Sequence, residues 1–117
     1  MVGLYVVFYA KRCIRPHIKN LACSKMKLGM AHMGNKGCCS IRFQYKDSTL
    51  TFGCAHLESG RSTELEQIRR NQLEAIITKS FVNDRGLNRN AYDWQSHDIK
   101  VIFGDLNFRN IQSLEFD

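Results

Sequence analysis

Long hydrophobic runs are missing from this chain of 117 residues. The longest run, Leu4 to Ala10, has seven residues, whereas a membrane-spanning helix needs roughly 18. The positive charges Lys11 and Arg12 follow this run, although in a secretory signal they would precede it. We therefore expect no transmembrane segment and no secretory leader, and we expect a cytoplasmic protein.

Proline and glycine are also scarce, with 1 proline and 8 glycines. This scarcity excludes collagen-like and mucin-like compositions. Hydrophobic residues make up 44% of the chain and charged residues 24%, which excludes disorder as the main state because so much apolar surface must be buried. The length allows one small domain.

Cysteines are present in an odd number, 5, and no two are spaced as C-x-x-C. Cys38 and Cys39 are adjacent. This arrangement favours reduced thiols over a disulfide scaffold. The spacing of the cysteines and histidines fits no standard structural zinc site.

Basic residues outnumber acidic ones, 17 to 11, which gives a net charge of +6. Such an excess is typical of proteins with an anionic partner, such as a nucleic acid, a phosphate ester or an anionic membrane. On charge alone, a solvated basic face is the simpler explanation.

Residue periodicity predicts the first elements. Residues 3–10 are rich in β-branched and aromatic types, which predicts a buried strand, and the region from Lys19 to Met30 has room for another. Residues 37–45 and 48–57 alternate between apolar and polar types around the pair Lys46-Asp47. This pattern predicts a β-hairpin.

A helix is predicted over residues 63–81, because apolar residues recur there at helical spacing. Thr63 and Glu66 have capping-box spacing, and the segment 83–86 ends the helix. Residues 83–98 are polar and predict a loop, and residues 99–103 predict a strand that Gly104-Asp105 breaks. The second half is therefore a βαβ unit, and the fold class is α/β.

Polar side chains follow two of these strands. His56 ends one strand, and Asp105 and Asn107 end the other. Because a βαβ crossover brings the ends of parallel strands to one edge, we expect all three side chains within roughly 10 Å, about two strand spacings. From position alone, turn formation by Asp105 and Asn107 and a structural role for His56 stay open.

A third candidate is Gly34-Asn35-Lys36-Gly37, where two glycines surround a cationic side chain. Backbone N–H groups in such a segment can wrap an anion. A simple glycine-assisted turn before the hairpin is the alternative.

Together these motifs resemble the inositol polyphosphate 5-phosphatases of the endonuclease/exonuclease/phosphatase superfamily. The resemblance is carried by M-G-N-K-G at residues 33–37, H-L-x-x-G at residues 56–60, Arg70-Asn71, G-D-L-N-F-R at residues 104–109, and the opening segment 3–11. It implies a partial four-layer α/β sandwich with mixed β-sheets flanked by helices. Residues 1–117 would be a central fragment of the catalytic domain.

The resemblance also implies a chemistry, the Mg²⁺-dependent removal of the 5-phosphate from phosphoinositides or soluble inositol polyphosphates. By resemblance, Asp105 activates the attacking water, Asn107 binds the scissile phosphate and His56 contacts it. Asn35, Lys36 and Arg109 are assigned to substrate binding, Arg109 by supporting the turn from Asp105 to Asn107. The metal ligands stay unassigned.

The family's upstream metal-binding glutamate and its downstream S-D-H motif have no counterpart here, so we expect the chain alone to be a poor enzyme. Two alternatives remain. One is a catalytically incomplete phosphoinositide-binding remnant, and the other is a related Mg²⁺-dependent nuclease. The G-N-K-G and G-D-L-N-F-R forms argue against the nuclease, so we expect no nucleic-acid partner. Peripheral contact with the cytosolic membrane face is expected for the full protein.

Overall fold

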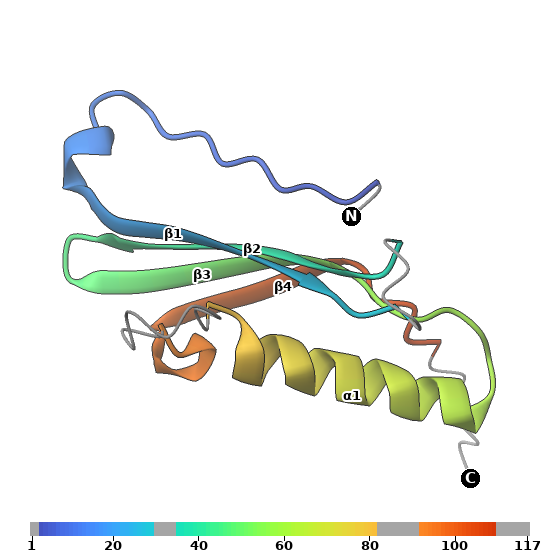
Figure 1. Cartoon of the computed structure of the whole chain (residues 1–117). Helices are drawn as coiled ribbons and strands as arrows, with labels where there is room; N and C mark the ends of the chain where they lie inside the picture. The colour runs from blue at the N-terminus through green and yellow to red at the C-terminus, as the bar shows by residue number, and fades with distance from the viewer. Residues whose placement is uncertain (1–2, 30–34, 82–91, 110–117) are drawn as a thin grey trace, which may run out of the picture.

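The computed structural model describes residues 3–29, 35–81 and 92–109. Its elements lie in the order η1 (Arg15–His17), β1 (Ile18–Lys27), β2 (Gly37–Tyr45), β3 (Ser48–His56), α1 (Thr63–Lys79), η3 (Trp94–Ser96) and β4 (Ile99–Asp105) (Figure 1). The α/β prediction is confirmed. In the described ranges no helix is long and apolar enough to cross a membrane.

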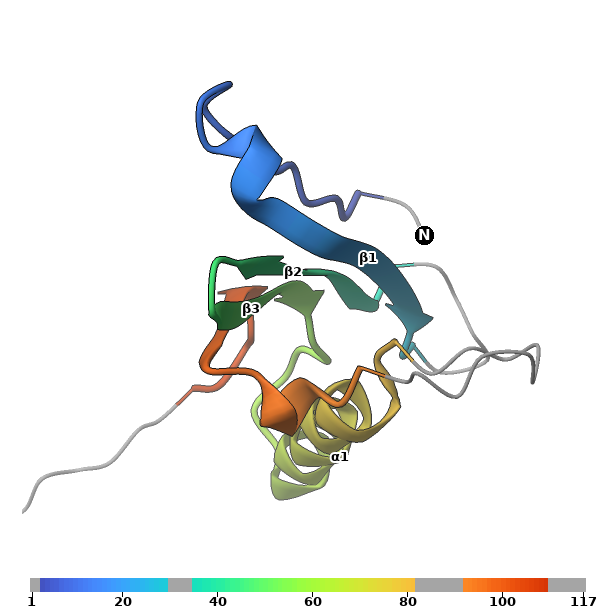
Figure 2. The ribbon, with the colours of Figure 1, turned by 90° about the vertical axis from the view of Figure 1, so that its left-hand side faces the viewer.

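One mixed sheet organises the molecule, with strand order β1-β2-β3-β4. The first three strands pair antiparallel, and β4 adds to β3 in parallel. The helix α1 lies along one face of this sheet, and the N-terminal segment runs along the other (Figures 1 and 2). The chain from β3 through α1 to β4 is therefore the predicted βαβ unit.

The predicted hairpin is confirmed, since β2 and β3 pair in continuous register from Tyr45↔Ser48 at the loop to Gly37↔His56 at the far end. Lys46 adopts a left-handed φ of 52°, which the two-residue loop requires. This register determines which residues of the two strands share a face.

The core lies between the sheet and α1. Its buried hydrophobic residues are Cys38, Ala55, Leu57, Ile76 and Trp94. Gly53 has a packing role there, because a Cβ at this position would lie only 2.7 Å from the ring of Trp94. The sheet therefore presents a backbone surface against which the indole packs.

The helix α1 starts at Thr63 as predicted, but its N-cap lies one residue before the predicted capping residue. Ser62 is the N-cap, and its side chain accepts a hydrogen bond from the backbone N–H of Leu65 at 3.3 Å. With the cap at Ser62, Glu66 no longer stands three residues beyond it, so the predicted capping box does not form. The helix ends at Lys79, and the predicted stop at residues 83–86 lies outside the described residues.

Residues 3–10 do not form the predicted strand. They pack on the sheet face opposite α1, where the Phe8 ring centroid lies 4.6 Å from that of Phe43 and the Cys39 thiol donates to the Leu4 carbonyl at 3.7 Å. The prediction was wrong because apolar side chains can be partly covered by packing across a sheet face, without a backbone partner at an edge.

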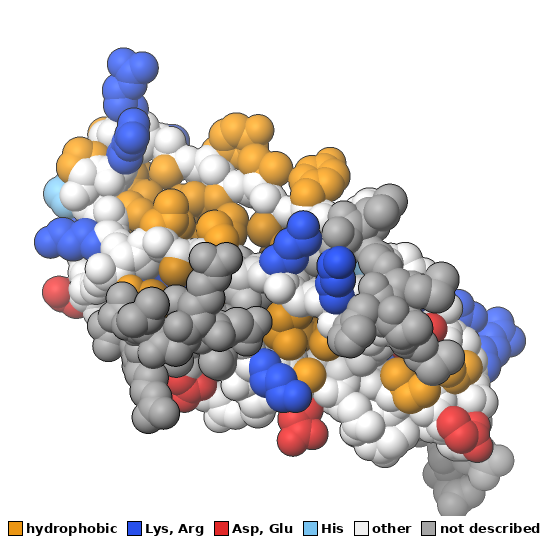
Figure 3. Space-filling view, in the orientation of Figure 1, with side chains coloured by type: hydrophobic (Ala, Val, Ile, Leu, Met, Phe, Trp, Pro, Cys, Tyr) orange, Lys and Arg blue, Asp and Glu red, His pale blue; other side chains and the backbone are white. Residues whose placement is uncertain are grey.

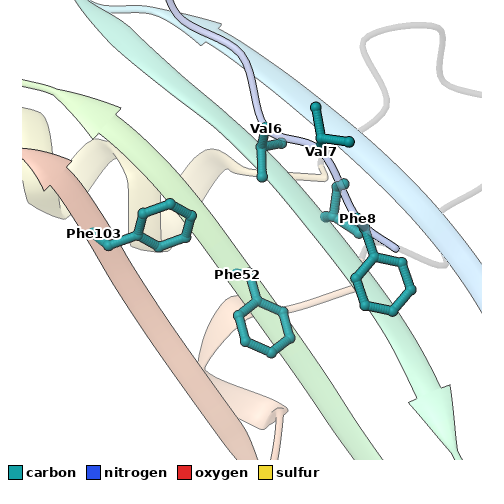
Figure 4. Close-up of a pocket in the computed structure, with 6 residues that line it drawn as sticks. Val6, Val7, Phe8, Phe52 and Phe103 are labelled. Carbon is teal, nitrogen blue, oxygen red and sulfur yellow. The ribbon is translucent and has the colours of Figure 1, made fainter. Parts of the chain in front are cut away.

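We call the sheet face opposite α1 the outer face. Hydrophobic side chains gather between it and the N-terminal segment (Figure 3). Val6, Val7, Phe8, Ile41, Phe52 and Phe103 line an apolar cavity of about 170 Å³ there (Figure 4).

Strand β4 continues beyond its predicted end, through Gly104 to Asp105. Gly104 has a φ of 119°, a conformation that L side chains rarely adopt. Because glycine permits it, the strand keeps its pairing with β3 up to the polar end. The predicted loop over residues 83–98 contains the short helix η3, and its first part lies outside the described residues.

Candidate active site

His56 and Asp105 are register partners at the ends of β3 and β4. The residue opposite His56 on β2 is Gly37. Since partners across a sheet project to the same side, one row of the outer face runs from Gly37 through His56 to Asp105. We call this row the catalytic row.

The His56 and Asp105 side chains lie together, as the βαβ unit predicts. Nε2 of His56 is 3.6 Å from Oδ2 of Asp105. That distance is too long for a hydrogen bond, but it allows an ion pair when the imidazole is protonated. The two side chains are 35% and 66% exposed, so water and a ligand reach the carboxylate.

Lys36, which the resemblance assigned to substrate binding, contacts this pair directly. Its Nζ lies 2.9 Å from Nε2 of His56, and the residue is only 7% exposed. An ammonium group has no acceptor, so a charged Lys36 is the donor in this contact. Within the described ranges Lys36 has no carboxylate partner, so it supplies positive charge to the row.

Asn107 contacts the end of β3. Its amide Nδ2 donates to the Leu57 carbonyl at 3.0 Å, and its φ is 53°, which asparagine tolerates better than most residues. The Leu57 N–H in turn donates to the Asp105 carbonyl at 3.0 Å. Asn107 therefore holds the segment after β4 against the residue that follows His56.

Asn35 and Arg109, which were also assigned to substrate binding, are exposed. Neither side chain forms a hydrogen bond or an ion pair with another of the residues that the structure describes. Hydrogen bonds of Asn107 and Leu57 hold the turn from Asp105 to Asn107, and the support from Arg109 that the resemblance implied is not among the contacts of the described residues.

Sequence reasoning missed Arg69. This α1 residue is 2% exposed, and its guanidinium donates to the carbonyls of Glu58 and Gly60 at 3.2 and 2.9 Å. It also lies 5.8 Å from the ring of Phe108. Arg69 therefore positions the segments that follow β3 and β4. The only signal in the sequence was a charged residue beside the apolar stripe of the helix.

Gly104 brings β4 close to β3 at this site. A Cβ at residue 104 would overlap the Ala55 carbonyl oxygen and lie 3.0 Å from the Ala55 nitrogen. Glycine therefore sets the strand separation immediately before the pair His56 and Asp105.

This arrangement suits an anion. A buried ammonium, an imidazole and an exposed carboxylate converge where two strands end, and a cation beside a water-accessible base is what phosphate chemistry requires. Among the described residues no group of three or more His, Cys, Asp or Glu side chains surrounds a metal-sized position. Asp105 is the carboxylate of the row, and a carboxylate oxygen is a ligand that Mg²⁺ prefers.

A family model described as Endonuclease/Exonuclease/phosphatase family 2 matches residues 1–115. Among curated proteins, Type I inositol polyphosphate 5-phosphatase 2 of Arabidopsis thaliana is 38% identical over 113 residues, which are 93% of this chain and 17% of that protein. Type I inositol polyphosphate 5-phosphatase 4 of the same plant is 34% identical over 114 residues, 93% of this chain and 21% of that protein. The chain thus spans about a fifth of the length of these relatives.

A solved structure is also similar. It is the inositol polyphosphate 5-phosphatase domain of SpSynaptojanin in complex with inositol (1,4)-bisphosphate and calcium ion. The TM-score is 0.64 and the identity 32%, over 86% of this chain and 26% of that one. The likeness therefore covers both sequence and fold.

Proposed function

Because this chain belongs to the endonuclease/exonuclease/phosphatase family 2 and resembles its inositol polyphosphate 5-phosphatases, we propose that it carries the catalytic row of an enzyme that hydrolyses the 5-phosphate of inositol polyphosphates or phosphoinositides. The observation that carries the proposal is the contact of His56 with both Asp105 and Lys36 at the ends of two parallel strands. The named activity of the relatives supports the substrate class.

The Asp105 carboxylate has the exposure that a general base needs. At 66% exposure it can accept a proton from a water as the water oxygen bonds to phosphorus and the bond from phosphorus to the inositol oxygen breaks. The leaving oxygen takes up a proton, and the products are an inositol hydroxyl and inorganic phosphate. A positioned base contributes about 10²–10⁴-fold to such a rate.

Lys36 and His56 have a different role. A phosphoryl group in transfer spreads negative charge over its oxygens, and fixed cations and donors stabilise that charge. The ammonium of Lys36 is held beside the ring of His56 at 2.9 Å, so its charge needs little rearrangement to reach a bound phosphate. Asn107 fixes the loop beside them through Leu57 and retains a second N–H for a phosphate oxygen.

A divalent cation fits the carboxylate end of the row. Mg²⁺ is commonly bound by one or two carboxylates together with waters and substrate phosphates, and Asp105 would hold it here. When bound, the ion neutralises phosphate charge. The calcium ion of the solved relative supports a divalent cation, and Mg²⁺ is our proposal for its identity.

We also propose a cytoplasmic location with peripheral membrane contact. The net charge of +6 supports attraction to anionic lipid headgroups.

The test uses a chimera in which residues 1–117 replace the matched segment of the Arabidopsis thaliana Type I inositol polyphosphate 5-phosphatase 2. The chimera is supplied with inositol 1,4,5-trisphosphate and Mg²⁺. Chromatographic identification of inositol 1,4-bisphosphate as the product supports the proposal. A folded chimera that releases no phosphate, or that releases the 1- or 4-phosphate, contradicts it. A chimera with Asp105→Asn controls for contaminating phosphatases.

A further inference from the structure

Two cysteines face each other across the hairpin on the outer face. Cys39 of β2 and Cys54 of β3 are register partners, so their side chains project to the same side. The Cys39 thiol donates to the carbonyl of Leu4, which lies in the segment over the outer face. Both cysteines are free and partly exposed.

Their spacing suits a disulfide. Directly opposed residues of an antiparallel pair have Cα atoms about 4.5–5.5 Å apart, and disulfides span Cα distances of roughly 4.4–6.8 Å. The corresponding Cβ separation of about 4.5–5.5 Å exceeds the mean of about 3.8 Å in disulfides. The bond would therefore draw the two strands slightly closer and stay reducible.

The other cysteines are placed differently. Cys38 is adjacent to Cys39 in sequence but points into the core, where it is 1% exposed and within 3.3 Å of the Ser40 hydroxyl. Cys23 stands opposite Ile41 on β1, and Cys13 precedes η1. Neither Cys13 nor Cys23 is the direct partner of another cysteine.

We propose that Cys39 and Cys54 form a dithiol modification site that a peroxide converts to a disulfide. One thiol loses its proton and the thiolate attacks a peroxide oxygen, the O–O bond breaks, and the leaving hydroxide takes up that proton, so that a sulfenic acid and a water form. The second sulfur then attacks the sulfenic sulfur, the S–O bond breaks, the S–S bond forms and a second water leaves. The two thiols are oxidised and the peroxide is reduced, so hydrogens, oxygens and electrons balance.

The electrostatics agree with this order of events. Burial raises the pKa of the Cys54 thiol, and the neighbouring Cys39 raises it further. Two adjacent thiolates repel one another, so one sulfur stays protonated while the other reacts. Disulfide formation removes that repulsion.

The site lies beside the catalytic row. Cys39 is two residues beyond Gly37, and Cys54 is two residues before His56. Lys36 directly precedes Gly37, so the disulfide would tie together the two strands whose ends hold Lys36 and His56. The modification site does not depend on the proposed function, because its formation requires no phosphatase activity.

The experiment uses the full chain with Cys13→Ser and Cys23→Ser, which removes the exposed thiols that would link separate molecules. The protein is treated with hydrogen peroxide, unfolded, alkylated with iodoacetamide and weighed by mass spectrometry. We expect a monomer that has lost two hydrogens and accepts one alkyl group. After trypsin we expect residues 37–42 joined to residues 47–61. The proposal would be overturned if Cys39 and Cys54 were both alkylated after the peroxide treatment. It would also be overturned if they were oxidised to sulfinic or sulfonic acids with no disulfide between the two peptides.

A matched variant identifies the sulfur on β2, because residues 37–42 contain both Cys38 and Cys39. Adding Cys38→Ala must preserve the link, and adding Cys39→Ser must abolish it. The reverse pattern would assign the bond to Cys38 and contradict the register argument. The linked peptide in the parent protein is read directly, so it does not depend on either variant folding.

Discussion

Replacing Gly104 with alanine tests how closely β4 approaches β3. The residue has a φ of 119°, and a side chain in a left-handed conformation costs roughly 1–2 kcal/mol. The new Cβ would also overlap the carbonyl oxygen of Ala55. Because the obstacle is backbone, β4 must move away from β3, and overpacking of this kind typically costs a further 1–3 kcal/mol. Together these two costs should lower the free energy of unfolding by about 2–5 kcal/mol.

Urea denaturation followed by circular dichroism measures this loss, with Gly3→Ala as the matched control. Gly3 also has a positive φ, 79°, but no atom lies within 4 Å of the position its Cβ would take. The control should therefore show only the conformational cost, about 1 kcal/mol. A Gly104→Ala protein within about 1 kcal/mol of wild type would refute the close approach of the strands, since the positive φ alone accounts for that much.

Four further outcomes are expected. In the chimera, Asp105→Asn should lower kcat by about 10²–10⁴-fold with stability within about 0.5 kcal/mol of wild type, because its carboxylate is exposed; near-normal turnover would exclude it as the base. Lys36→Met should weaken binding of inositol 1,4,5-trisphosphate by about 10–100-fold, the worth of a charged hydrogen bond, and calorimetry showing unchanged affinity would contradict its role. Burial raises the pKa of the Cys38 thiol to about 11 from an ordinary 9.0, so iodoacetamide should alkylate Cys38 at pH 8 about 100-fold more slowly than an unperturbed thiol, and rapid labelling would show that it is not buried. The backbone N–H and the hydroxyl of Thr49 hold the pKa of Asp98 below its ordinary 3.8, so the stability lost on Asp98→Asn should be full at neutral pH and vanish as acid protonates the wild-type carboxylate; a loss that persists at pH 2 would point to another cause.

Local patterns predicted most of the secondary structure. The hairpin followed from alternation around a two-residue loop, and β3, α1 and β4 followed from periodicity and length. The parallel pairing of the strands that end at His56 and Asp105 followed from the strand–helix–strand crossover of a βαβ unit. Each of these features depends on residues close in sequence or on a general topological rule.

The errors concern interactions between distant segments. The apolar pattern of residues 3–10 predicted a buried strand, but none of these residues is buried and only Leu4 and Val6 are partly covered. The pattern held no information on whether the segment pairs with a strand edge or lies across a sheet face. The direct contact of Lys36 with His56 depends on where β2 begins relative to the end of β3, which only the pairing register sets. Arg69 could not be recognised because its partners are backbone carbonyls, which leave no trace in the sequence.

The central claim is that Lys36, His56 and Asp105 together bind one phosphate group. Its most direct test is a nuclear magnetic resonance titration of the isotope-labelled chain with inositol 1,4,5-trisphosphate, and with inositol 1,4-bisphosphate as the comparison ligand. We predict that the side-chain signals of all three residues shift together, and that they saturate at a lower concentration of the trisphosphate. Shifts confined to exposed lysines elsewhere, or equal affinity for the two ligands, would contradict the account.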